Sequence, residues 1–245
     1  MSTPAMSVES APALGEGQRL LYTFTAPSKT MADLRRNASW WVPWLLVSVA
    51  SLAFVFALDK KIGWGQVIET QIQSNPKAAE RLEKLAPEQR AKIAKQQEMG
   101  ARYVSYAAPI TNLLLLSVVA GVLVGVFNFG FGARFTFRQM MGISAYSFLP
   151  MILSTLLSIL VVWFVDPESF DVKFPIASSI GYFIPATMPF WKTLLGAVDV
   201  FTLWTMFLLA VGVSQLSKVK KGTAFAAIFG VFLVLKLVGA ALSSM

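Results

Sequence analysis

Long stretches of apolar residues dominate the pattern along the chain. Residues 103–133 and 139–165 contain no charged side chain, and three further, largely apolar runs cover residues 40–58, 193–217 and 222–245. The hydrocarbon core of a bilayer is about 30 Å thick, and about 20 apolar helical residues are needed to cross it. The pattern therefore predicts an all-α, polytopic membrane helix bundle. Its five expected transmembrane helices cover residues 40–58, 103–130, 139–165, 193–216 and 223–242.

Two polar segments precede the first span. Residues 1–18 are rich in Ser, Ala, Pro and Gly and lack aromatic residues, which is typical of a disordered tail. In residues 19–39 apolar and polar positions alternate, and Pro27-Ser28 is a helix-start signal. We expect this segment to form a short amphipathic helix on the cytoplasmic membrane surface, with a plain linker as the alternative.

Residues 59–102 are rich in charged side chains and separate the first two spans. Pro76 and Pro87 stand where helices can begin, since proline is favoured in the first turn. The segment is predicted to be an extramembrane helical hairpin. We interpret it as a solvated connector; a partner-binding helix is the alternative.

Prolines and small residues punctuate the other apolar regions. Residues 174–191 are uncharged, but three prolines interrupt them, so they are interpreted as an interfacial loop and not as a sixth span. Pro150 lies inside the third span and is expected to kink it. Gly121 and Gly125 have the small-residue spacing that lets membrane helices pack closely.

The composition supports the same class. The chain has 245 residues, of which 56% are hydrophobic and 14% charged, with a formal net charge of +8. The basic residues flank the apolar runs, which indicates membrane orientation and contact with anionic lipid, not a nucleic-acid partner. These flanking residues are Arg35, Arg36, Arg134, Arg138, Lys218, Lys220 and Lys221. They predict a cytoplasmic N-terminus and a C-terminus outside, although the basic residues within 59–102 count against this orientation.

The chain contains no cysteine and no histidine. Thiolate nucleophiles, iron–sulfur centres and His-based zinc sites are therefore excluded, and so is the usual near-neutral proton carrier. No phosphate-binding loop or metal motif is visible in the sequence. We predict a protein that is not an enzyme, with no catalytic residue, cofactor or metal.

Two formal charges, Asp199 and Lys236, lie inside predicted spans. Spans four and five are expected to be antiparallel neighbours, and both residues should lie at similar depth. An unpaired charge there is costly, so we hypothesise an ion pair. A structural lock is the favoured role. The alternative is a small transporter or channel with a polar path near the pair, and an intramembrane enzyme comes third.

Three passages together resemble the Yip1 family of five-span membrane proteins, especially its bacterial members. The first is Phe24-Thr25-Ala26-Pro27-Ser28-Lys29-Thr30 leading to Ser39-Trp40-Trp41-Val42-Pro43; the second is Phe137-Arg138-Gln139 followed by Ala145-Tyr146-Ser147-Phe148-Leu149-Pro150; the third is Asp199-Val200-Phe201-Thr202-Leu203-Trp204 followed by Leu208-Leu209-Ala210-Val211-Gly212-Val213. The resemblance covers about residues 19–242. In the usual pattern a proline follows the aspartate, where this chain has Val200.

The resemblance implies a Yip1-like membrane domain over residues 40–245, a cytoplasmic N-terminus and a C-terminus on the far side. Eukaryotic members bind prenylated Rab GTPases in traffic between endoplasmic reticulum and Golgi, whereas no reaction is established for bacterial members. We therefore expect a non-enzymatic protein of a bacterial inner membrane that organises membrane lipid, partner proteins or further copies of itself. The residues expected to matter for integrity are Asp199, Phe201, Trp204, Lys236, Tyr146 and Pro150.

Overall fold

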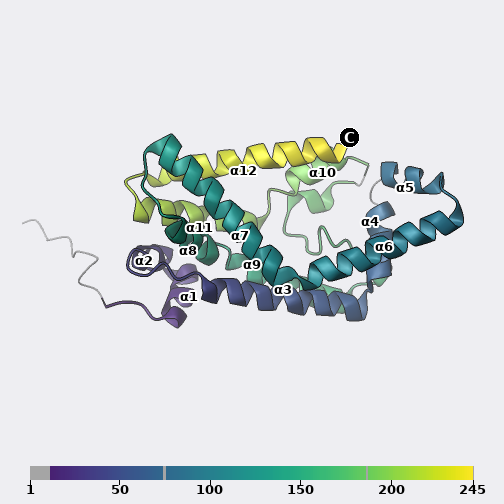
Figure 1. Cartoon of the computed structure of the whole chain (residues 1–245), viewed down its shortest axis with the longest axis horizontal. Coiled ribbons are helices and arrows are strands. Elements are labelled where there is room, and N and C mark those ends of the chain that lie inside the picture. Colours follow the sequence, from purple (N-terminus) through teal and green to yellow (C-terminus); the bar gives the residue numbers. More distant parts are fainter. Residues whose placement is uncertain (1–11, 74–75, 186, 245) are drawn as a thin grey trace, which may run out of the picture. The chain divides into compact units, whose positions relative to one another are not determined.

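The structure is a computed structural model that describes residues 12–73, 76–185 and 187–244 (Figure 1). Over these ranges it is all-α, as predicted, and has no strand beyond one isolated bridge. Four helical segments are long and apolar enough to cross a membrane: Trp41–Lys61, Ala108–Gly130, Phe137–Phe164 and Lys221–Ala241. They coincide with predicted spans one, two, three and five.

The chain divides into two compact units. The first comprises Met1–Pro43, Leu115–Leu149 and Thr205–Phe229. The second comprises Trp44–Leu114, Pro150–Trp204 and Gly230–Met245. Several long helices therefore begin in one unit and end in the other.

The first unit opens with two short helices, α1 (Glu16–Thr25) and α2 (Pro27–Asp33), where a single helix was expected. Pro27 starts the second helix because it lacks an amide donor and fits a first turn. The predicted disordered tail over residues 1–18 ends too late, since α1 begins at Glu16. The rest of that prediction, over residues 1–11, lies outside the described residues.

Helix α8 (Phe137–Ser147) lies at the centre of the first unit, because every residue from Met140 to Ser147 is buried. Thr136 caps it: the Thr136 hydroxyl accepts the Gln139 amide, and the Gln139 side chain accepts the Thr136 amide. Pro150 was expected to kink a continuous helix, but the helix is interrupted there. Helix α8 ends at Ser147 and α9 (Pro150–Phe164) starts at the proline, which is also where the second unit resumes.

Helix α7 (Ala108–Gly125) continues into a π-helical turn, η2 (Val126–Gly130). Asn128 in this turn holds the following loop. Its side-chain amide donates to the Phe135 carbonyl at 2.9 Å, and its carbonyl accepts the Phe135 amide at 2.8 Å. Helices α11 (Val200–Leu216) and α12 (Lys221–Ser244) complete the chain.

The second unit begins within α3 (Trp41–Lys61), and the end of α3 is followed by three helices, not by the predicted two-helix hairpin over 59–102. These are α4 (Trp64–Gln73), α5 (Pro76–Glu83) and α6 (Pro87–Tyr106), and the last two begin at the prolines that marked helix starts. A hydrophobic cluster secures their base, with Leu58, Trp64 and Val67 packed beside Val162 and Phe170.

The predicted fourth span, 193–216, is wrong at its start. Its first residues belong to a separate short helix, α10 (Pro189–Leu195), and α11 begins only at Val200. The chain turns between the two helices because Gly196 lies against Gly181 of η4 (Ile180–Phe183). A Cβ on Gly181 would be 2.5 Å from the Gly196 nitrogen. An antiparallel bridge between Ser179 and Asp199 completes the turn.

Candidate functional site

The expected Asp199–Lys236 ion pair is absent, although the structure describes both side chains. Asp199 instead caps α11, because its carboxylate accepts the Thr202 amide at 2.8 Å. The Lys236 ammonium lies 5.3 Å from the centre of the Phe232 ring on its own helix. Asp199 was expected inside a membrane span, at the same depth as Lys236. It lies instead one residue before the start of α11.

The other predicted residues occupy different places. Phe201 and Trp204 follow Asp199 in the first turns of α11 and are half-buried, and Pro150 is buried at the start of α9. Tyr146 is fully buried on α8. Of the predicted set, the structure thus keeps Asp199, Phe201 and Trp204 together at the start of α11 and holds Tyr146 in a separate cluster.

Tyr146 belongs to a buried polar cluster that joins the N-terminal helices to α8. Its hydroxyl donates to the Glu16 carboxylate at 2.5 Å. The Arg19 guanidinium donates through Nε and Nη2 to one carboxylate oxygen of Asp33, at 2.8 and 2.7 Å, and through Nη1 to Glu16 at 3.4 Å. Glu16 therefore links the Arg19–Asp33 pair on α1 and α2 to Tyr146 on α8.

Backbone contacts reinforce the same cluster. The hydroxyls of Thr23 and Thr30 both donate to the Arg19 carbonyl, at 2.8 and 2.9 Å, and both side chains are buried. The Thr30 contact ties α2 directly to α1. We refer to Glu16, Arg19, Asp33 and Tyr146 as the N-terminal lock.

The electrostatics of the lock follow from its burial. Arg19 is only 3% exposed and Asp33 6%. Burial lowers the pKa of Arg19, but its hydrogen bond to Asp33 and the Asp33 charge raise that pKa by more, so the guanidinium stays charged. The lock is therefore a set of hydrogen-bonded charges that fixes the geometry of α1, α2 and α8.

Sequence reasoning placed Tyr146 in a motif but missed its partners. Glu16 was assigned to the tail, and Arg19 and Asp33 were treated as the polar face of a surface helix. A signal was present in the sequence. Arg19 and Asp33 carry opposite charges in a short segment with few other charged residues, so packing α1 against α2 can bring the two side chains together.

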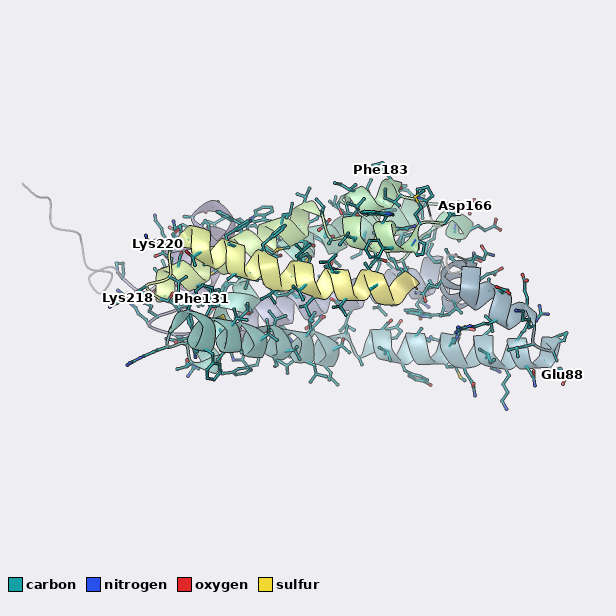
Figure 2. The ribbon with its side chains drawn as sticks, turned by 90° about the horizontal axis from the view of Figure 1, so that it is seen from above. Glu88, Phe131, Asp166, Phe183, Lys218 and Lys220 are labelled. Carbon is teal, nitrogen blue, oxygen red and sulfur yellow. The ribbon has the colours of Figure 1, made fainter. Side chains whose placement is uncertain are left out.

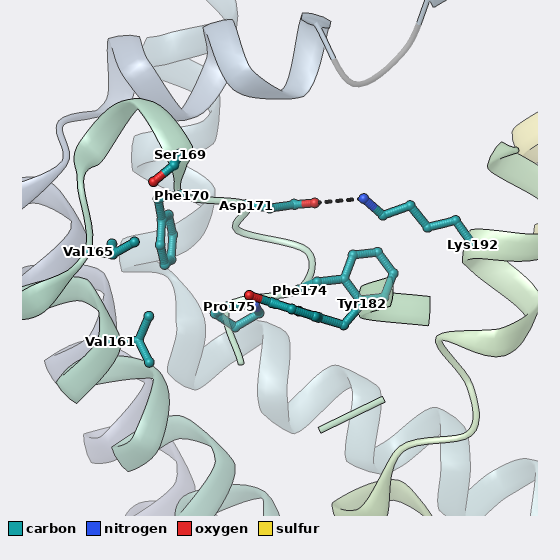
Figure 3. Close-up of a pocket in the computed structure, with 9 residues that line it drawn as sticks. All are labelled: Val161, Val165, Ser169, Phe170, Asp171, Phe174, Pro175, Tyr182 and Lys192. Carbon is teal, nitrogen blue, oxygen red and sulfur yellow. Dashed lines mark hydrogen bonds and ion pairs between the residues drawn. The ribbon is translucent and has the colours of Figure 1, made fainter. Parts of the chain in front are cut away.

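A second candidate site lies in the loop of the second unit (Figure 3). It is a pocket of about 300 Å³ lined by Val161, Val165, Ser169, Phe170, Asp171, Phe174, Pro175, Tyr182 and Lys192. Lys192 donates to Asp171 at 3.1 Å across its mouth and lies 5.0 Å from the Phe174 ring centre. The pocket's two charges thus neutralise each other, which suits a structural clasp better than a catalytic pair.

Among the described residues no group of three or more Asp or Glu side chains could hold a metal ion. The arrangement so far defines a helical membrane protein whose N-terminal helices are locked to a buried central helix. The family model of the Yip1 domain matches residues 21–243, which is most of the chain and runs from α1 into α12. The chain therefore belongs to the Yip1 family. No curated protein and no solved structure matches it.

Proposed function

We propose that this Yip1-family protein is a non-enzymatic, five-span protein of a bacterial inner membrane that organises partner proteins through its extramembrane helices. The span that this proposal adds to the four long helices is α11, the fourth in chain order, whose 17 residues are fewer than the about 20 that a perpendicular crossing needs. Short spans are accommodated by local thinning of the bilayer. The N-terminus is cytoplasmic and the C-terminus outside.

The observation that carries this proposal is the surface of α6. The helix is 20 residues long and has no buried residue. Its base is fixed, because Asp59 at the end of α3 accepts hydrogen bonds from Arg102 at 3.1 Å and from Tyr106 at 2.9 Å. One side of α6 packs against α4, and the other side of this long, anchored helix is exposed and suited to contact another macromolecule.

One face of α6 is also partly apolar. Met99 and Tyr103 are one turn apart, and their exposed fractions are 45% and 75%. The apolar span of the structure begins only at Ala108, so both side chains precede it. Large exposed apolar side chains outside a span favour a protein contact over a purely solvated connector. The partner is a second protein or a second copy of this chain.

The structure lacks the Asp199–Lys236 ion pair on which the transporter alternative was based. That alternative required a polar path through Asp199 and Lys236, but Asp199 caps α11 and Lys236 lies over an aromatic ring. Among the residues that the structure describes, no contact of Asp199 or Lys236 favours an ion pathway over a structural role.

Site-specific photo-crosslinking in native membranes tests the proposal. A photoreactive amino acid at Met99 should give a discrete protein adduct, identified by mass spectrometry, whereas the same probe at Leu160, exposed on α9, should not. Reversing the charge of Glu98, which precedes Met99 and takes no part in the anchor of α6, should weaken the adduct. If Met99 gives no protein adduct beyond that of Leu160, the proposal is wrong.

A further inference from the structure

Two short loops of the first unit face each other across a pocket. One loop, residues 131–135, joins the π-turn η2 to α8, and the other, residues 217–220, joins α11 to α12. The pocket has a volume of about 630 Å³, within the range of small-molecule sites, and we call it the loop pocket. Figure 2 places Phe131, Lys218 and Lys220 together on these loops.

The loop pocket carries positive charge only. Arg134, Lys218 and Lys220 line it, and no Asp or Glu does. None of the three forms an ion pair with any described residue of the chain. Like charges gathered around one hollow repel each other, and an anion bound between them removes that repulsion.

The loops are held in place before any ligand binds. Asn128 clamps the Phe135 backbone, and the buried Phe127 ring contacts Phe131 at 5.5 Å and Phe135 at 6.3 Å between ring centres. On the other side, Ser217 donates to the Val213 carbonyl at 2.7 Å and accepts the Val219 amide at 3.2 Å. Loop backbones that are fixed before binding lose less conformational freedom when a ligand binds.

We propose that the loop pocket binds the phosphate group of an anionic membrane lipid. Arginine recognises phosphate through paired donors, and lysines add point charges. The pocket also includes Leu216 at the end of the apolar helix α11 and Phe131 just after the apolar segment Ala108–Gly130, so a lipid's glycerol and acyl region can lie against apolar side chains while its phosphate meets the cations. Which leaflet supplies the lipid depends on the proposed topology, whereas the phosphate-binding chemistry of the pocket does not.

The chain offers a matched control. Arg138 and Lys221 are exposed, lie at the starts of α8 and α12 beside the same two loops, and do not line the pocket. The site variant is Arg134→Gln with Lys220→Gln, and the control variant is Arg138→Gln with Lys221→Gln. Each variant loses one arginine and one lysine, so the two have equal net charge.

The experiment titrates each purified full-length protein in neutral detergent with phosphatidylglycerol, and separately with phosphatidylcholine, and counts bound lipids by native mass spectrometry. The wild type should bind phosphatidylglycerol at least tenfold more tightly than phosphatidylcholine. The site variant should lose at least tenfold of that affinity, as expected for charged hydrogen bonds, and the control variant less than twofold. Equal losses in the two variants, or equal binding of the two lipids, would overturn the proposal.

Two further arms separate the remaining explanations. The charge-preserving variant Arg134→Lys with Lys220→Arg should retain selectivity for the anionic lipid. If this variant loses that selectivity as the site variant does, the site is not based on charge. Glycerol 3-phosphate at millimolar concentration should not displace the lipid; complete displacement would assign the pocket to a soluble phosphate and overturn the lipid proposal. Neither result depends on whether α6 binds a protein.

Discussion

At the scale of single residues, the buried charges of the N-terminal lock have the largest energetic consequence. Removing a guanidinium and a carboxylate from water costs several kcal/mol per ion, and only close hydrogen bonding offsets that cost. Arg19 and Asp33 achieve this with two donors on one carboxylate oxygen. Removing one partner leaves the other charged and buried, which is worse than removing both.

Asp33→Asn should therefore destabilise the protein strongly, by about 3–5 kcal/mol, because Arg19 keeps its charge without a carboxylate. The double variant Arg19→Met with Asp33→Asn should be less destabilised than the sum of the two single variants. Thermal unfolding in detergent measures all three.

A surface pair provides the reference for that measurement. Lys84 and Glu80 form an ion pair at 2.7 Å with both side chains largely exposed. Lys84→Met should change stability by about 1 kcal/mol or less. Strict additivity for Arg19 and Asp33, as for two distant sites, would show that the lock is not a coupled unit.

Asp199 and Lys236 should behave independently. Asparagine caps helices about as well as aspartate, so Asp199→Asn should be nearly neutral, whereas Asp199→Ala should cost about 1 kcal/mol. Adding Lys236→Met should give an additive effect in a thermal double-mutant cycle. A coupling above about 1 kcal/mol would restore the ion pair that the sequence suggested.

At the scale of elements, α8 and α11 pack closely against each other in the first unit. A Cβ on Gly212 of α11 would lie 2.4 Å from Cγ2 of Ile143 on α8 and 3.1 Å from the Met31 sulfur. Three elements thus meet where only a glycine fits. Such close approach requires a small residue, as in other membrane helix contacts.

Gly212→Ala should destabilise the protein by about 1–3 kcal/mol, because the new methyl group overlaps Ile143. Combining it with Ile143→Ala should recover part of the loss. Gly125→Ala is the control, since nothing lies within 4 Å of its added Cβ. If the Gly212 and Gly125 variants unfold at the same temperature, α8 and α11 are not packed as described.

The sequence predicted the elements better than their contacts. Apolar runs located four long helices, and Pro76 and Pro87 located two helix starts, because both signals are local. The spacing of Gly121 and Gly125 suggested a close helix contact that the described chain makes at Gly212 instead. Which glycine meets a neighbour depends on residues far away in the sequence, such as Ile143.

The same distinction explains the site. Tyr146 was identified from a motif, but its partner Glu16 lies 130 residues earlier, and no local pattern connects the two. Asp199 was paired incorrectly, because the start of α11 is set by the contact of Gly181 with Gly196. Long-range contacts of this kind are decided by tertiary packing.

At the scale of the whole molecule, membrane topology depends on α11. If α11 crosses, the loop that precedes it and the loop that follows it lie on opposite sides of the membrane. If it does not, both loops lie on the same side. The chain has no cysteine, so a single introduced cysteine reports one position without background.

An impermeant maleimide applied to intact cells should label Gln96→Cys and Glu168→Cys, and should label Lys221→Cys only after permeabilisation. All three side chains are exposed, so access to them depends on the side of the membrane. Labelling of Glu168→Cys and Lys221→Cys under the same condition would reduce the number of spans to four.

The meeting of Met31, Ile143 and Gly212 also sets an order of assembly during synthesis. The segment that carries Met31 leaves the ribosome first, but its docking surface is complete only after α11 has been made. At about 5–20 residues per second, that delay is roughly ten to forty seconds. For part of this interval α8 has already been made and Tyr146 can bind Glu16, but the Met31 side chain still lacks its contact with α11 and is open to chaperones and membrane-insertion factors.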